Sequence, residues 1–497
     1  MTHPAPSGRW LLPLAIVLVL AVLYRVPPLL NAGDINSDAA VVGLQGQHML
    51  RGEWQLHLWR ADYQGVFDPL LAGIFCAVLG PKPSSVFMVP VVGLLAMVGL
   101  AFDLLRRRVG PWGAAALVMP LVFAPMASNS PMVYVMRQSL ATALVLGVWL
   151  ADRGRLRLAA LVWAFAVYVD IFAVVALPAL AVFAAAVKLG EERFEALVFG
   201  PRGRRVLLAV TALGVVALLS LIAVAAKPRS NFVLLVTTCL PFALGAKVFI
   251  HDAQISAPLW SPPLPVLLLQ LAGAAVFVAS VVSAVLLARA KAIPFALRRL
   301  GMMGVVVTAA TLAAFCVSGK VADMWSCRYL APIFWFCPFT FAPLAHRLGT
   351  RKLARLHAPY WATALLGGWL SYGVQVDGAR PVVHPRANGE AEAALRAELL
   401  RAGVHEAESH YWLAYRLTFL FQEDPLVVPF ERAAERHPPY RLRTDAAPFK
   451  TLIFNPLEPR ADPDEWAAKL GARGIPFERK QVATYTVFYL RPSSPAP

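Results

Sequence analysis

Charged residues are scarce in this chain of 497 residues: 15% are Asp, Glu, Lys or Arg, whereas 58% are apolar. Soluble globular proteins carry about 25% charged residues, so the composition excludes an ordinary water-soluble enzyme. Cysteine is also sparse. The five cysteines fall mostly inside apolar runs and show no Cys-x-x-Cys spacing, so we expect neither a disulfide framework nor a zinc site.

Motifs of soluble nucleotide-binding enzymes and proteases are missing as well. The sequence contains no Walker loop, no Gly-x-Gly-x-x-Gly, no His-Glu-x-x-His and no Gly-x-Ser-x-Gly, which argues against chemistry on soluble nucleotides. The histidines of the C-terminal part do not pair at metal-ligand spacing, and His48 is interpreted as an interfacial residue. We therefore expect no cofactor and no bound metal ion.

The net charge of +17 belongs to the apolar part of the chain. Residues 374–497 hold 16 acidic and 16 basic residues, whereas residues 1–373 hold 13 acidic and 30 basic residues. A positive surface of this size would favour nucleic acid in a soluble protein. Here the cations form short clusters between long apolar runs, so the pattern indicates orientation in a membrane.

The apolar runs predict a polytopic α-helical membrane protein with about 11 membrane segments. The first run, residues 10–24, has no small-residue cleavage pattern after it, so we expect an uncleaved first span. Further runs, several of them shorter than the roughly 20 residues of a straight span, lie near residues 85–105, 112–127, 136–151, 158–169, 171–187, 206–226, 263–288, 301–318, 329–346 and 360–373. We expect a membrane domain over residues 1–375 and a second domain over residues 376–497.

The cation clusters predict the orientation, because cytoplasmic loops are enriched in lysine and arginine. With the N-terminus inside, the inner loops hold 20 cations and the outer loops hold 10. The segment of residues 158–187 then starts and ends on the inner side of the membrane, with Asp170 at its turn. The C-terminal domain is expected outside, in the periplasm if the host has an inner membrane of the Gram-negative type.

The longest outer loop, residues 31–84, contains two helix-like stretches. Residues 37–52 have apolar spacing near 3.6, with Ser37 or Asp38 as the cap, which predicts an amphipathic helix along the membrane surface. Residues 67–80 predict a second juxtamembrane helix. The C-terminal part is predicted to be a small α/β domain, with helices near 390–403, 412–421 and 464–474 and strands near 405–412, 425–430, 450–455 and 483–490.

Two acids are candidate site residues, because an ionisable group in an apolar loop is costly unless it is paired or hydrated. Asp38 stands where helix amides favour an ionised carboxylate. It could accept a proton from a hydroxyl nucleophile, or it could only cap its helix. Asp170 is the acid most deeply embedded in apolar sequence. It could be a second site carboxylate, or it could hydrogen-bond its own turn or pair with Arg137.

Outer-side cations are candidates for binding a phosphate. Arg328, in the run SCRYLAP, begins a span directly after a short outer loop. A guanidinium at that depth suits forked hydrogen bonding to phosphate, or it could anchor the span at the interface beside Tyr329. Arg137, at the outer start of another span, and Lys247 are further candidates for the same role.

This order of parts resembles the GT-C superfamily of membrane glycosyltransferases, in particular bacterial family 39-like proteins related to protein mannosyltransferases and the aminoarabinose transferase of lipid A. The similarity lies in one span, a long outer loop with an acidic motif, many further spans, an Arg-Tyr-Leu-x-Pro motif and an extracytoplasmic tail. Asp38 in NSDAA matches the acidic motif, although Ala39 follows it where the family often has Glu. Residues 328–332, RYLAP, match the second motif.

The resemblance implies transfer of a sugar from a polyprenyl-phosphate donor to a lipid, glycan or protein acceptor on the outer face, by a single displacement that inverts the sugar carbon. Asp38 would act as the base. Asp170 would stand in for the acid that many members carry in the next outer loop. Arg328 and Tyr329, with Arg137 and Lys247, would bind the donor phosphate. Two other classes stay open: a transporter or flippase of a lipid-linked or anionic substrate, and a noncatalytic assembly protein.

Overall fold

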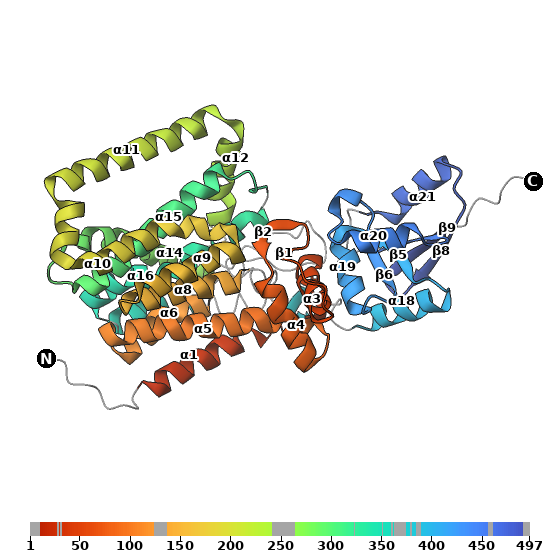
Figure 1. Cartoon of the computed structure of the whole chain (residues 1–497), viewed down its shortest axis with the longest axis horizontal. Coiled ribbons are helices and arrows are strands. Elements are labelled where there is room, and N and C mark those ends of the chain that lie inside the picture. The colour runs from red at the N-terminus through yellow and green to blue at the C-terminus, as the bar shows by residue number, and fades with distance from the viewer. Residues whose placement is uncertain are drawn as a thin grey trace, which may run out of the picture.

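The molecule consists of a helical bundle and a smaller C-terminal domain. The described part of the long predicted outer loop, residues 32–84, lies between them and is named the first outer loop (Figure 1). The structure is a computed structural model. It describes residues 10–26, 29, 32–123, 137–240, 264–322, 324–349, 351–358, 361, 374–377, 380–383, 389–455 and 461–490. Apart from Trp361, the predicted run 360–373 lies outside the described residues.

Each apolar run predicted between residues 10 and 346 overlaps a bundle helix, and α12 (Ala226–Leu234) is a further helix that no predicted run covers. The bundle helices are α1 (Leu11–Leu23), α5 (Pro83–Val109), α6 (Pro111–Val122), α8 (Gln138–Asp152), α9 (Leu156–Val169), α10 (Leu177–Phe199), α11 (Pro201–Val224), α12, α14 (Leu264–Leu286), α15 (Phe295–Val317) and α16 (Ala331–Leu348). Most of them bury one face in a single apolar core. All five cysteines are buried, and none of them forms a disulfide bond.

Among the described residues, four helices are long and apolar enough to cross a membrane: α5, the combined stretch Ile171–Phe199, the stretch Leu271–Arg289 and α15. The segments Ala212–Val224 and Ala226–Cys239 meet at 102° and add a fifth if they form one broken span. Several other bundle helices are apolar but have only 10–17 residues. The number of about 11 membrane segments therefore stays a prediction.

The first outer loop folds into α3 (Ser37–Leu50), the hairpin β1 (His57–Leu58) and β2 (Ala61–Gly65), and α4 (Phe67–Leu79). Both predicted helices are present. Because 11 of its 14 residues are buried, α3 is covered by other parts of the protein, and its place along the membrane surface stays a prediction. One side of α3 packs on α4 and another packs on α19 (Tyr411–Leu420) of the C-terminal domain. The apolar spacing in the sequence predicted one buried face of α3 but could not predict the second.

The C-terminal domain is an α/β domain, as the sequence predicted. Its five-stranded sheet has the order β6-β5-β7-β9-β8, in which β5 runs parallel to β6 and β7, and β9 runs antiparallel to β7 and β8. The strands are β5 (Glu406–Ser409), β6 (Leu426–Pro429), β7 (Lys450–Phe454), β8 (Phe477–Val482) and β9 (Tyr485–Leu490), and the helices are α18 (Glu390–Arg401), α19, α20 (Pro438–Asp445) and α21 (Pro463–Ala472). An antiparallel hairpin of β3 (Val374–Asp377) and β4 (Arg380–Val383) precedes this sheet in the chain. This hairpin, β8 and α20 were not predicted.

Two glycines bring α3 and α4 into close contact. A Cβ atom added to Gly46 would lie 2.3 Å from the carbonyl oxygen of Pro69 and 2.6 Å from the backbone nitrogen of Gly73. Both are backbone atoms, which cannot turn aside as the end of a flexible side chain can. The glycines therefore set the separation of the two helices, and one of these helices carries Asp38.

We predict that Gly46→Ala lowers the free energy of unfolding by about 1–3 kcal/mol, because the added methyl group pushes α3 away from α4. Thermal unfolding of the detergent-solubilised protein, followed by circular dichroism, measures the change. Gly99→Ala in α5 is the matched control, since a Cβ atom there meets nothing within 4 Å. That control should be neutral or stabilising by about 0.5–1 kcal/mol. Equal melting temperatures for the two variants would contradict the close contact.

Candidate functional site

Asp38 lies in the first turn of α3 but does not cap the helix. The cap is Asn36, whose side-chain oxygen accepts a hydrogen bond of 2.9 Å from the Ala39 backbone nitrogen. The prediction that Ser37 or Asp38 caps the helix is therefore wrong. Ser37 instead donates a hydrogen bond of 2.5 Å to the backbone carbonyl of Tyr411. The carboxylate of Asp38 stays available for other partners at the positive end of the helix.

The partners of Asp38 come from the C-terminal domain. The Tyr411 hydroxyl donates a hydrogen bond of 2.5 Å to Asp38 Oδ1, and the Arg436 guanidinium lies 3.5 Å from the same oxygen. Arg436 Nε also donates to the Tyr411 hydroxyl at 3.1 Å. Burial, followed by the charge of Asp38, raises the pKa of Tyr411 well above its usual value. The phenol therefore keeps its proton and holds the carboxylate in place.

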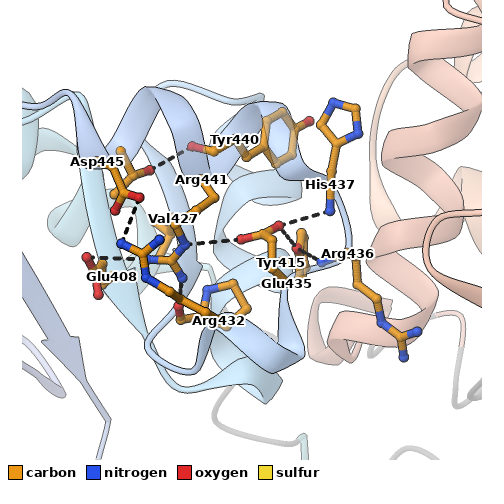
Figure 2. A network of polar contacts seen from close by, with 12 residues as sticks. Glu408, Tyr415, Val427, Arg432, Glu435, Arg436, His437, Tyr440, Arg441 and Asp445 are labelled. Carbon is orange, nitrogen blue, oxygen red and sulfur yellow. Dashed lines mark hydrogen bonds and ion pairs between the residues drawn. The ribbon is translucent and has the colours of Figure 1, made fainter.

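A turn anchored inside the C-terminal domain aims Arg436 at the first outer loop. The neighbouring Glu435 is buried, accepts a hydrogen bond from the Tyr415 hydroxyl, and accepts another of 2.9 Å from the His437 backbone nitrogen. The Arg436 backbone nitrogen donates to the Tyr415 oxygen at 2.5 Å. In Figure 2, Glu435 points into its own domain, whereas the side chains of Arg436 and His437 point towards the ribbon of the first outer loop.

A second group of side chains surrounds Asp170, which is 1% exposed. One carboxylate oxygen accepts a hydrogen bond of 2.8 Å from the Phe172 backbone nitrogen at the start of the turn η2 (Ile171–Ala176). The other oxygen accepts from Gln64 Nε2 at 3.0 Å and from Arg137 Nε at 3.1 Å. Asp170 thus holds the turn and also fixes one edge of Arg137.

The guanidinium of Arg137 is held by two rings. Its central carbon lies 4.6 Å from the Phe172 ring centre and 5.0 Å from the Tyr329 ring centre. The side chain is 16% exposed. Within the described part of the chain, no hydrogen-bond acceptor faces its two terminal nitrogens. Arg137 therefore offers an oriented pair of donors to an anion, because Asp170 uses only the Nε–H group.

Arg328 and Tyr329 lie next to this group, on the turn η5 (Met324–Leu330) that leads into α16. The Arg328 guanidinium carbon is 5.2 Å from the Tyr329 ring centre, and the same ring faces Arg137 and Phe172. Two of the predicted phosphate-binding arginines therefore share one aromatic neighbour. Lys247 lies outside the described residues.

Tyr63 on β2 lies between the two groups of side chains. Burial raises the pKa of Tyr63, while the positive charges of Arg436 and Arg137 act in the opposite direction. The positive charges of Arg436, in the C-terminal domain, and of Arg137, in the bundle, thus both act on the Tyr63 phenol. The ammonium group of Lys320 also lies 5.5 Å from the centre of its ring. Arg436, which contacts Asp38, and Arg137 therefore both act on Tyr63.

Asp68 at the start of α4 was not among the candidate site residues from the sequence, and it is 4% exposed. Burial raises its pKa to about 7, and a hydrogen bond from Ser139 opposes part of that rise. Its Oδ1 atom has no hydrogen-bond partner among the residues that the structure describes. A carboxyl group with this pKa can exchange a proton near neutral pH. Its flanking apolar sequence was the only signal that could have identified it.

At the opposite end of the bundle, acidic side chains form ion pairs with several arginines. There Asp103 pairs with Arg106, Arg107 and Arg153, and Asp152 pairs with Arg108 and Arg299. The helix α8 joins the two ends, since Arg137 precedes its first residue and Arg153 follows its last residue. The acids of this second end are fully paired with arginines, so they serve structure and not chemistry.

The fold is shared with solved structures of ArnT, at an identity so low that the similarity concerns the fold alone. ArnT from Cupriavidus metallidurans bound to undecaprenyl phosphate is similar at a TM-score of 0.57 and 14% identity, over 98% of this chain and 98% of that chain. Its apo state is similar at a TM-score of 0.56 and 14% identity, over 97% and 98%. The sequence matches no protein-family model and no curated protein.

We predict that Asp68→Asn stabilises the protein more at pH 7.5 than at pH 5. Between about pH 4 and pH 7 the unfolded chain loses this proton while the folded chain keeps it, so the free energy of unfolding falls as the pH rises. Asparagine does not ionise, so the variant does not lose this stability. Its gain in the free energy of unfolding should be about 2–3 kcal/mol larger at pH 7.5 than at pH 5. Thermal unfolding at both pH values measures it. Asp62→Asn, at an exposed acid of the same loop, is the control, and equal gains at both pH values for Asp68→Asn would refute the assignment.

Proposed function

We propose that this protein is a membrane glycosyltransferase that moves a sugar from a polyprenyl-phosphate donor to a hydroxyl acceptor. Two observations support the proposal: the Asp38 carboxylate is held by Tyr411 and Arg436, and the Arg137 guanidinium is held by Asp170 and two aromatic rings. The similar fold of ArnT, which was solved with undecaprenyl phosphate, supports a donor of this kind. We propose that the other end of the bundle, rich in arginine, faces the cytoplasm, because cytoplasmic ends collect cations.

The reaction that fits this site is a single displacement. The acceptor oxygen attacks the anomeric carbon while its proton passes to the Asp38 carboxylate. The bond between that carbon and the phosphate oxygen breaks, and the polyprenyl phosphate leaves with the electron pair. Attack from the face opposite the leaving group inverts the configuration at the sugar carbon. Tyr411 and Arg436 keep the carboxylate pointed at the acceptor.

The arginines serve the leaving group. The terminal nitrogens of Arg137 can donate two parallel hydrogen bonds to phosphate oxygens, and Arg328 adds positive charge beside the shared Tyr329 ring. Asp170 serves as the residue that positions Arg137, because its oxygens are already occupied by the turn, Gln64 and Arg137. The acceptor base is therefore assigned to Asp38 and not to Asp170.

We predict that Asp38→Asn lowers kcat for sugar transfer by about 100-fold or more, because the amide keeps the size and hydrogen bonds of the side chain but cannot take the proton. Purified protein in lipid nanodiscs is incubated with radiolabelled undecaprenyl-phosphate-linked hexoses and pentoses, and release of free undecaprenyl phosphate is measured. Asp62→Asn should transfer at the wild-type rate. Full activity of Asp38→Asn would refute its role. A flippase would move the lipid-linked sugar across the bilayer without releasing undecaprenyl phosphate.

We predict that Arg137→Ala weakens binding of undecaprenyl phosphate by about 10–100-fold, since hydrogen bonds to a charged group contribute about 1.5–3 kcal/mol. Arg137→Lys should restore only part of the affinity, because an ammonium group lacks the planar fork. Binding is measured on protein in nanodiscs by the shift of melting temperature with ligand concentration. Arg153→Ala, at the far end of α8, is the control. Equal losses in the Arg137 and Arg153 variants would indicate a nonspecific effect of charge.

A further inference from the structure

Two histidines and a glutamate meet where the first outer loop touches the C-terminal domain. His48 lies in the last turn of α3, Glu53 follows that helix, and His437 immediately precedes α20. Each side chain offers one ligand atom, and the three atoms lie within 4.8 Å of one another. The group is separate from the transferase site, because His48 lies ten residues beyond Asp38 on α3, about 15 Å along the helix axis.

The ring of His437 is buried without a hydrogen bond. The residue is 5% exposed, its ring stacks on Trp59 at 4.0 Å, and neither ring nitrogen has a hydrogen-bond partner among the described residues. Figure 2 shows the ring turned away from its own domain, towards the first outer loop. The described side chains therefore leave the ring nitrogens of His437 available to a ligand.

His48 is oriented in the way that a metal-bound histidine is. Its Nδ1 atom faces the Glu53 carboxylate at 2.7 Å. Its Nε2 atom faces the Tyr440 hydroxyl at 2.8 Å and the Glu423 carboxylate at 3.2 Å. Histidines that bind a metal through one nitrogen donate the other N–H group to a carboxylate or a similar acceptor, which sets the ring orientation. Here Glu423 and Tyr440 occupy that outer position.

We propose that His48, Glu53 and His437 bind one divalent transition-metal ion, with Zn²⁺ as the ion that suits the ligands. Two imidazoles and one carboxylate are a common zinc ligand set, and a water molecule fills the fourth tetrahedral position. Tetrahedral bonds of about 2.0–2.2 Å place ligand atoms about 3.4 Å apart, so movements of about 1 Å complete the site. The partly exposed Glu53 side chain leaves room for that water. Glu53 and Glu423 also offset the ion's charge beside Arg51.

The ion would join two segments that are nearly 390 residues apart in the chain. His48 and Glu53 belong to the loop that carries Asp38, and His437 directly follows Arg436, which contacts Asp38. Metal binding would therefore hold the C-terminal domain against the loop. Binding of the ion and sugar transfer are measured separately, so failure of one leaves the other standing. The sequence predicted no metal site because the histidines that converge here are far apart in the chain.

The test uses the full-length protein in detergent, stripped with a chelator and titrated with ZnCl₂ or CoCl₂ at neutral pH. We expect about one metal ion per chain by elemental analysis, visible absorption typical of tetrahedral Co²⁺, and a melting temperature that rises with metal concentration. His437→Gln should weaken binding at least tenfold and abolish the metal-dependent rise. Glu423→Gln should weaken it less, since that residue orients His48 and does not bind the ion.

His405→Gln is the matched control. His405 is an exposed histidine of the same domain that also pairs with a carboxylate, Asp424, at 2.8 Å, and its loss should leave metal binding unchanged. Melting in chelator shows whether each variant folds as the wild type does. Wild-type protein that binds no Zn²⁺ or Co²⁺, or equal binding by His437→Gln and the wild type, would overturn the proposal and leave a hydrogen-bonded His48–Glu53 pair only.

Discussion

The packing of α19 against α3 is the contact on which the site depends. A Cβ atom added to Gly43 of α3 would lie 2.6 Å from the Phe419 ring of α19, so the two helices approach closely only because this position is glycine. The approach brings Tyr411, at the start of α19, to Asp38, at the start of α3. Burial of α3 between α4 and α19 is stabilised by apolar contact, and polar contacts then determine how the helices align.

These polar contacts cross the interface along its whole length. The buried Arg416, which Glu392 of its own domain holds at 2.6 Å, donates across the interface to the Gly33 carbonyl at 3.0 Å. Glu423 joins Arg51 and His48, and these two residues hold its pKa down to about 2 although burial opposes them. A half-buried carboxylate with an arginine and a histidine as partners favours one docking position over others, because a shift separates the paired groups. The C-terminal domain is therefore a structural part of the site.

The charged side chains at the two ends of the bundle differ in how completely they are paired. At one end, Asp103 and Asp152 are bonded to several arginines each, and these networks tie α5, α8 and α15 together. At the site end, the described residues pair Arg137 on one edge, and the partners they give Asp38 come from the C-terminal domain. A group with an open edge can bind or release a ligand at low cost, whereas a fully paired group cannot. This difference separates the region proposed for catalysis from the region that stabilises the fold.

The sequence by itself determined the positions of the bundle helices, most elements of the C-terminal domain and the candidates Asp38, Arg137, Asp170 and Arg328. Apolar runs and side-chain periodicity act within one segment, so they can be read from neighbouring residues. Only the tertiary structure decided that Asn36 caps α3, that α3 is covered on a second face, and which partners each candidate has. The roles of Tyr411, Arg436 and His437 belong to this second kind. Each depends on a contact across more than 370 residues of chain, and no local pattern encodes which surfaces meet when separate segments pack to remove apolar area from water.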